Sequence, residues 1–206
     1  MNQRIISYSQ AVFEGFDESL KHDKRVFLIG EGVPDPKGLF GTTRGLVEKY
    51  GKERVLDMPV SENAVTGICV GTAIRGMRPI LNHQRVDFSL LSYDQIVNNV
   101  AKWFHMFGGL VHVPLVIRMI IGRGWGQGSQ HSQSLQAVFA HIPGLQVVMP
   151  ATPGDAKGML IAATRQYNPV IFIDHRWLHY TKGHVPEGAY EVSLTGAKVL
   201  KKGSDI

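Results

Sequence analysis

Short apolar runs rich in β-branched residues alternate with longer helical segments along almost the whole 206-residue chain. This alternation is typical of βαβ units, in which crossover helices join parallel strands. The runs are nearly continuous in apolar character, as expected for strands buried on both faces. We therefore predict an α/β fold with a mostly parallel sheet and helices on both of its faces. The expected strands are 26–29, 55–56, 79–81, 115–117, 147–149 and 170–173.

Helical patterns fill most of the intervals between these runs. The expected helices are 7–21, 62–75, 92–106, 132–141 and 155–167, several of them bounded by Pro or Gly. Two long glycine-containing loops, 32–45 and 122–128, follow strand-like runs. Ligands of open α/β sheets bind in the crevice at the carboxyl ends of the strands, so these loops indicate where a ligand lies.

Composition and charge exclude several classes of protein. The formal net charge of +5 comes from scattered Lys and Arg residues, including the pair Lys201 and Lys202, whereas nucleic-acid binders usually carry a basic patch. The single cysteine, Cys69, excludes a disulfide framework and a cysteine-based zinc site. No apolar stretch approaches the roughly 20 residues that span a bilayer, and the start lacks the apolar run of a signal peptide. We expect a soluble cytoplasmic protein that binds neither nucleic acid nor membrane.

Glu62 stands at a predicted strand-to-helix turn, so its carboxylate lies in the first helical turn. An acid there complements the helix dipole, and on position alone this structural explanation stands beside a catalytic one. Gly67 and Gly71 lie four residues apart on the same helix and would let it approach another backbone closely. Tight packing within one subunit is the alternative explanation for these glycines.

The loop 122–128 alternates glycine with other residues. It lacks the spacing of a dinucleotide fingerprint, because Gln127 or Ser129 stands where the third glycine is required. A loop that faces substrate and a plain surface loop both fit. His131 follows at a predicted helix start, where it either exchanges protons near neutral pH or caps the helix. No histidine pair has zinc-site spacing and no nucleophile elbow is present, so we predict no metal site and no serine hydrolase.

Several motifs occur in order from about residue 7 to residue 177, and only the ordered set is specific. They are Pro59-Val60-Ser61-Glu62, Val86-Asp87-Phe88-Ser89, Asp94-Gln95-Ile96-Val97-Asn98, Gln130-His131-Ser132-Gln133-Ser134, His141-Ile142-Pro143-Gly144-Leu145 and Asp155-Ala156-Lys157-Gly158. With these motifs the chain resembles the beta subunit of the decarboxylating component of pyruvate, branched-chain and acetoin dehydrogenase complexes. The resemblance implies a transketolase-like pyrimidine-binding domain, with thiamine diphosphate lying across an interface between two chains.

The resemblance also implies roles for five residues. Glu62 matches the glutamate that hydrogen-bonds a ring nitrogen of the aminopyrimidine and so activates that ring as a base toward the thiazolium carbon. Phe88 matches an aromatic residue that packs on the pyrimidine, an arrangement worth about 1 kcal/mol beyond area burial. Val60 and Gln84 match positions that line the same pocket, and His131 matches an active-site histidine near the reacting carbon. Because Glu62 must be neutral at one stage, we expect it to be buried.

Some features depart from the family pattern. Gly32 stands where the family usually has an acid in the first loop, and the segment 82–85 replaces a more acidic or apolar stretch. These two differences affect the expected substrate more than the expected cofactor. Gln166 stands where an acid is common in relatives that hold potassium, so a potassium ion beside Asn168 is kept as an option. The Gly-Asp-Gly signature of the alpha chain, which binds magnesium and diphosphate, does not occur in the sequence. Magnesium and the diphosphate are therefore expected on a partner chain.

Residues 1–185 are expected to form the pyrimidine-binding domain, and 186–206 a linker with the start of a truncated C-terminal domain at the strand-like run 197–200. The chain would act only with an alpha-type subunit, in oxidative decarboxylation of a 2-oxo acid with acyl transfer to lipoamide. A lipoyl acyltransferase partner and self-association are also expected. Two alternatives stay open: a split transketolase-like enzyme acting on a sugar, suggested by the basic segment 82–85, and a noncatalytic assembly module, suggested by the missing C-terminal domain.

Overall fold

The computed structural model describes residues 4–196, 199 and 201–204. Its centre is a six-stranded sheet in the order β3-β2-β4-β5-β7-β6, in which every neighbouring pair is parallel. The strands are β2 (Val26–Gly30), β3 (Val55–Leu56), β4 (Arg78–His83), β5 (Val116–Ile121), β6 (Gln146–Val148) and β7 (Val170–His175). All six predicted strands are confirmed, with ends that shift by a few residues.

Helices cover both faces of this sheet, as predicted. On one face, α1 (Tyr8–His22) and α6 (Pro153–Arg165) pack on Leu28, Ile80 and Phe172. On the other face, α3 (Glu62–Ile74) and α5 (Gln136–Ala140) pack on Leu81 and Ile117. Successive side chains of a strand point to opposite faces, which explains why each strand contributes to both apolar cores.

The segment between β4 and β5 differs from the single helix predicted over 92–106. It forms a 3-10 helix, η1 (Val86–Ser92), a π-helical stretch, η2 (Gln95–Val100), and a short helix, α4 (Trp103–Met106). In the π-helical stretch the amide of Ala101 donates to the carbonyl of Ile96, five residues back, at 3.0 Å. Trp103 Nε1 also donates to Asn99 Oδ1 at 3.0 Å, a side-chain bond that helps hold the widened turn.

The helix predicted over 132–141 is correct only in its second half, where α5 lies. The preceding residues satisfy their polar groups elsewhere: Ser132 Oγ donates to the carbonyl of Gly128 at 2.7 Å, and the amide of Gln133 donates to Asp87 Oδ1 at 3.2 Å. The prediction that His131 stands at a helix start is therefore wrong. His131 is the last residue of a 3-10 turn, η3 (Ser129–His131).

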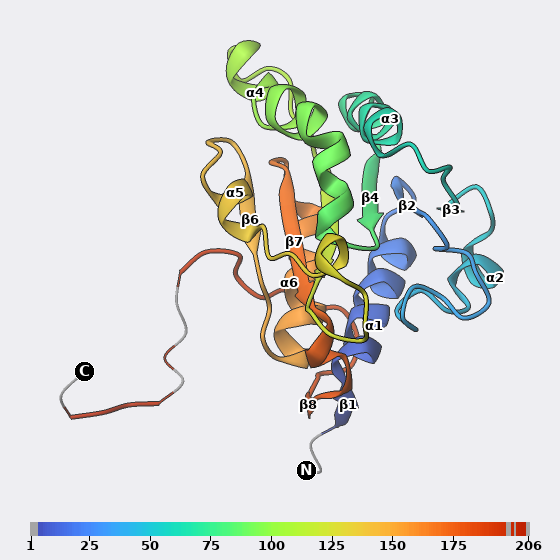
Figure 1. Cartoon of the computed structure of the whole chain (residues 1–206), viewed down its shortest axis with the longest axis vertical. Coiled ribbons are helices and arrows are strands. Elements are labelled where there is room, and N and C mark those ends of the chain that lie inside the picture. The colour runs from blue at the N-terminus through green and yellow to red at the C-terminus, as the bar shows by residue number, and fades with distance from the viewer. Residues whose placement is uncertain (1–3, 197–198, 200, 205–206) are drawn as a thin grey trace.

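Four further elements complete the described fold. Strands β1 (Ile5–Ser7) and β8 (Lys182–His184) pair antiparallel, and Figure 1 shows them at one end of the molecule with α3 and α4 at the other. The remaining two are the short helices α2 (Leu46–Tyr50) and η4 (Arg176–Tyr180). None of the helices within the described residues is long and apolar enough to cross a membrane.

The polar segment after residue 185 contacts the sheet domain. Lys157 Nζ donates to the carbonyl of Pro186 at 2.9 Å, and the Tyr190 hydroxyl donates to the carbonyl of Gly154 at 2.7 Å. The division into domains at residue 185 stays a prediction. Of the strand-like run 197–200, residues 197, 198 and 200 lie outside the described residues, and Val199 is exposed.

Candidate active site

The candidate site lies where the strand order of the sheet reverses. From β2 the chain moves outward to β3 and then returns to β4 on the other side of β2, so the connections after β2 and β4 diverge. Such a reversal opens a crevice at the carboxyl ends of the strands, where ligands of α/β sheets bind. Glu31 directly follows β2 and Gln84 directly follows β4. Gln84 Nε2 donates to the Glu31 carbonyl at 2.7 Å, which ties the two loops together.

A small cavity occupies this crevice and has a volume of about 10 Å³. That is roughly the space of one water molecule, too little for an aromatic ligand enclosed by this chain alone. The cavity is lined by Glu31, Met58, Glu62, Asn82, His83, Gln84 and Phe88.

Glu62 is the first residue of α3 and turns into the cavity rather than toward solvent. It is 5% exposed, which confirms the expected burial. Its carboxylate accepts no hydrogen bond within the described residues, whereas its backbone carbonyl accepts one from Thr66 Oγ1 at 2.7 Å. A helix-start acid that served only the helix dipole would be expected at the surface, so this burial favours a functional role.

Glu31 brings a second carboxyl group to the same cavity. Burial raises the pKa of Glu31, and the nearby carboxylates of Glu62 and Asp57 raise it further. Glu31 Oε1 is buried without a hydrogen-bond partner within the described residues. The raised pKa favours retention of a proton on Glu31 in this cavity.

His83, the last residue of β4, lines the cavity as a neutral imidazole. Its burial lowers the pKa of the ring to about 4. Among the described residues, the ring makes one hydrogen bond, between Nε2 and the Ser92 hydroxyl at 3.4 Å. No role was predicted for Glu31 or His83 from the sequence, although each lies two residues beyond a predicted strand, at the sheet edge that the crevice rule selects.

Phe88 connects the cavity to His131. The two rings meet edge to face with their centroids 5.1 Å apart, and the half-buried His131 reaches the site through this contact without lining the cavity. Val60 is 79% exposed and does not line the cavity either. The structure therefore brings Glu62, Gln84 and Phe88 together, places His131 beside them, and leaves Val60 outside. No cluster of three metal-ligating side chains occurs in the part of the chain that the structure describes.

A second polar cluster, which we call the lower cluster, surrounds Arg118 and shares Asn82 with the cavity. The fully buried Arg118 donates to both oxygens of Asp174, at 3.0 and 2.9 Å, and to Thr42 Oγ1 and Asn82 Oδ1, at 3.0 and 3.2 Å. His179 Nε2 lies 2.6 Å from the second oxygen of Asp174. Burial by itself would raise the pKa of Asp174, but Arg118 and His179 together bring it below its usual value.

Three beta subunits of known enzymes are similar in sequence to almost the whole of this chain. The acetoin:2,6-dichlorophenolindophenol oxidoreductase subunit beta of Cupriavidus necator is 42% identical over 213 residues, covering 98% of this chain and 63% of the relative. The 2-oxoisovalerate dehydrogenase subunit beta of Bacillus subtilis is 41% identical, covering 98% and 62%. The mitochondrial pyruvate dehydrogenase E1 component subunit beta of Bos taurus is 37% identical, covering 98% and 57%. The chain thus spans about three fifths of the length of these relatives.

Two further comparisons concern the domain itself. A solved structure titled "Split gene transketolase, inactive beta4 tetramer" superposes with a TM-score of 0.66 at 17% identity, covering 83% of this chain and 51% of that one, which shows a shared fold. The family described as "Transketolase, pyrimidine binding domain" matches residues 4–180. This match covers the sheet, the crevice and both carboxyl groups, and the chain therefore belongs to the family of transketolase pyrimidine-binding domains.

Proposed function

We propose that this chain is the pyrimidine-binding part of the beta subunit of a thiamine-diphosphate-dependent 2-oxo-acid dehydrogenase. The observation that carries the proposal is the buried, unpartnered carboxyl group of Glu62 at the switch point of the sheet. Two relatives, 41% and 37% identical, are named as beta subunits of a 2-oxoisovalerate dehydrogenase and a pyruvate dehydrogenase, which supports a 2-oxo-acid dehydrogenase. The reaction that we propose is oxidative decarboxylation with acyl transfer to lipoamide.

The residues of the crevice suit the pyrimidine end of thiamine diphosphate. The cofactor supplies an electron sink for decarboxylation when it is bound. Glu62 would hold a proton against a ring nitrogen, because its carboxylate has no competing partner within the described residues. Glu31 would help to keep that proton in place, Phe88 would pack on the ring, and His131 would exchange a proton close to the reacting carbon. Val60 would reach the ring only from the open rim of the site.

An alpha-type partner would complete the site. The cavity within this chain is too small for the cofactor, and the outer face of α3 is uncovered in the described structure. Ile68 and Ile74 on that face are 57% and 40% exposed, and a Cβ atom added at Gly71 would meet nothing within 4 Å. These observations favour close approach by a second chain over packing within one subunit. We propose that this second chain binds magnesium and the diphosphate.

Other partners and ions have less support. A potassium ion beside Asn168 remains an option, but Arg78 already donates to the carbonyls of Thr164 and Gln166 in this region, both at 2.8 Å. Binding to a lipoyl acyltransferase, self-association and a cytoplasmic location stay predictions. A purely noncatalytic module gives no reason to bury the unpartnered carboxyl group of Glu62 beside the partly buried Glu31, so we favour the enzyme.

The experiment that tests this proposal is Glu62→Gln in the chain assembled with its alpha-type subunit and thiamine diphosphate. Turnover of a 2-oxo acid should fall by about 100-fold or more, because a positioned proton donor is typically worth 10²–10⁴-fold. The melting temperature should stay the same or rise, since a buried unpaired carboxyl group is removed. Glu48→Gln is the matched control, because Glu48 also stands in the first turn of a helix but is exposed. Full turnover in Glu62→Gln would refute the proposal.

A further inference from the structure

Arg85 is a buried cation beside the candidate site. It follows β4, is 2% exposed, and its Nη2 donates to the carbonyls of Gly122 and His131. Its Nε and Nη1 are buried without a hydrogen-bond partner within the described residues. A buried guanidinium normally uses its donors, so two unused N–H groups indicate that an acceptor is still to be supplied.

Asp87 is the carboxylate that lies beside Arg85, but it accepts no hydrogen bond from the guanidinium. Its Oδ2 lies 3.9 Å from Arg85 Nε, beyond hydrogen-bond distance, and is itself without a partner within the described residues. Its other oxygen accepts the amide of Gln133. Even if Nε and Asp87 moved into contact, the Nη1 donor of Arg85 would remain unpaired.

A second arginine, Arg176, is held at the same place by aromatic rings. Its guanidinium lies over Phe40, 3.9 Å from the ring centroid, and over Trp125, at 4.7 Å. Phe40 and Trp125 are the two non-glycine residues with positive φ among the described residues, at 51° and 59°. Such backbone strain tends to occur at ligand clamps, and stacking between rings fixes the direction of the guanidinium donors. One ring comes from the loop 32–45 and the other from the loop 122–128.

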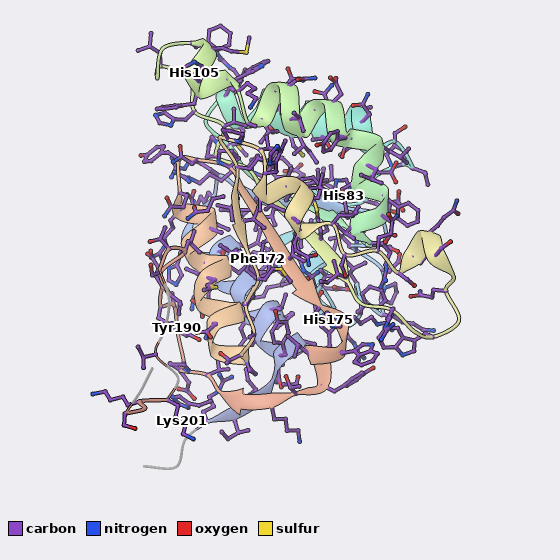
Figure 2. The ribbon with its side chains drawn as sticks, turned by 60° about the vertical axis from the view of Figure 1, so that its left-hand side comes forward. His83, His105, Phe172, His175, Tyr190 and Lys201 are labelled. Atoms are coloured by element: carbon purple, nitrogen blue, oxygen red, sulfur yellow. The ribbon has the colours of Figure 1, made fainter. Side chains whose placement is uncertain are left out.

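The two arginines converge on Gly122. Arg85 donates to the carbonyl of Gly122, and a Cβ atom added at Gly122 would lie 3.5 Å from the Cβ of Arg176 and 3.2 Å from the His175 ring. Figure 2 shows His175 at the carboxyl end of β7, next to Arg176 in sequence. Burial lowers the pKa of Arg85, and the charge of Arg176 lowers it further. The one carboxylate that forms an ion pair with Arg85 among the described residues is Asp87, so the two arginines leave an excess of positive charge at this site.

We propose that Arg85 and Arg176 bind an anionic substituent, a carboxylate or a phosphate, at the end of the substrate remote from the reacting carbonyl. The inference rests on the proposed function and narrows its substrate class to acidic 2-oxo acids. The remote end is the appropriate one, because cations that held the reacting carboxylate would stabilise the charge that decarboxylation removes and would slow the step. The unpaired N–H donors of Arg85 and the ring-stacked guanidinium of Arg176 would then form charge-assisted hydrogen bonds to the bound anion.

The test compares neutral and acidic substrates in the chain assembled with its alpha-type subunit and thiamine diphosphate. Reduction of 2,6-dichlorophenolindophenol gives kcat/KM for pyruvate and 2-oxobutyrate, and for 2-oxoglutarate and 3-phosphohydroxypyruvate. We expect at least one acidic substrate to exceed the neutral ones by about tenfold or more, and its identity separates a carboxylate from a phosphate site. A preference for the neutral substrates would overturn the inference and leave the proposed function intact.

Three variants locate the effect. Arg85→Gln and Arg176→Gln should each lower kcat/KM for the acidic substrate by about 10- to 100-fold and change it for pyruvate by less than about threefold. Arg85→Lys keeps the charge and should recover part of the loss, which separates recognition from misfolding of a buried site. Arg25→Gln, an exposed arginine paired with Asp23 at 2.7 Å, is the control. An equal loss for both substrate classes in Arg85→Gln and Arg176→Gln would contradict the inference.

If the wild-type complex turns over none of these four 2-oxo acids, calorimetric titration decides the anion site separately from the proposed function. Inorganic phosphate and succinate are the probes. Binding that is lost in Arg176→Gln would support the site, whereas no binding by the wild type, or equal binding by the variant, would overturn it.

Discussion

Two polar clusters lie at the carboxyl edge of the same sheet, and they differ in how their buried groups are satisfied. In the lower cluster, Arg118 donates two hydrogen bonds to the carboxylate of Asp174, which also forms a hydrogen bond with His179. In the upper cavity, Glu62 and Glu31 face one another, and Glu31 Oε1 has no partner within the described residues. Only the lower cluster pairs its charges within the described residues.

This difference indicates different roles. A buried ion network whose charges are paired fixes the relative positions of strands and loops without a ligand. Unpaired buried groups reduce stability, and proteins retain them chiefly at functional sites. The contrast therefore predicts that variants of the lower cluster lose stability, whereas variants of the cavity change pH behaviour or activity.

The largest expected effect comes from breaking the lower cluster at Arg118. Arg118→Met leaves the carboxylate of Asp174 buried with His179 as its remaining hydrogen-bond partner, and should lower the free energy of unfolding by about 3–5 kcal/mol. Urea denaturation of the purified chain measures it. The double variant Arg118→Met with Asp174→Asn should recover part of the loss, because no unpaired buried charge remains. A loss below about 1 kcal/mol in the single variant would show that the network is not structural.

A medium effect is expected at His83, which belongs to the cavity. Its pKa of about 4 in the folded chain lies below the ordinary value near 6.5, so the unfolded chain binds the proton more readily between these two pH values. Stability is then complete above about pH 6.5 and falls by about 3 kcal/mol as the pH decreases through 4.

Denaturation midpoints measured from pH 7 to pH 4 test this expectation. His83→Phe should remove most of the slope in this range, whereas His105→Phe, at an exposed position of α4, should keep it. An unchanged slope in His83→Phe would mean that other groups cause the loss of stability in acid.

The sheet and its layers could be predicted from the sequence because their signals are local. Each buried strand is an apolar run of a few residues, and helices α3 and α6 begin at a visible acid or proline. The pairing of β1 with β8 could not be predicted, since it joins Ile5 to His184, and three-residue strands carry no periodic pattern. The break in the helix predicted over 92–106 depends on side-chain contacts such as Trp103 to Asn99, which the apolar pattern does not record.

The candidate site was predictable only in part, for the same reason. Glu62 and Phe88 stand in motifs, and the structure brings them to one cavity as the resemblance implied. Glu31 and His83 were missed because their roles depend on which strand ends become neighbours. The pairing of Gly30 with Asn82 in β2 and β4 fixes that neighbourhood, and strand order is a property of the whole sheet.

The smallest expected effect is at Glu31. The substitution Glu31→Gln removes the charge of this side chain and keeps its shape. Glu31→Gln removes a carboxyl group whose pKa is raised by burial and by the neighbouring acids. A raised pKa means that the folded chain holds this proton more tightly, so stability is complete at low pH and decreases as the pH rises through the folded pKa. The variant should therefore melt about 1–3 °C higher than the wild type at pH 7, and the difference should disappear as the pH falls toward 4.5. Glu53→Gln, at an exposed position, should show no such pH-dependent difference. If Glu31→Gln instead melts lower than the wild type at pH 7, the chain itself stabilises the ionised carboxylate, and the cavity would belong with the self-satisfied cluster around Arg118.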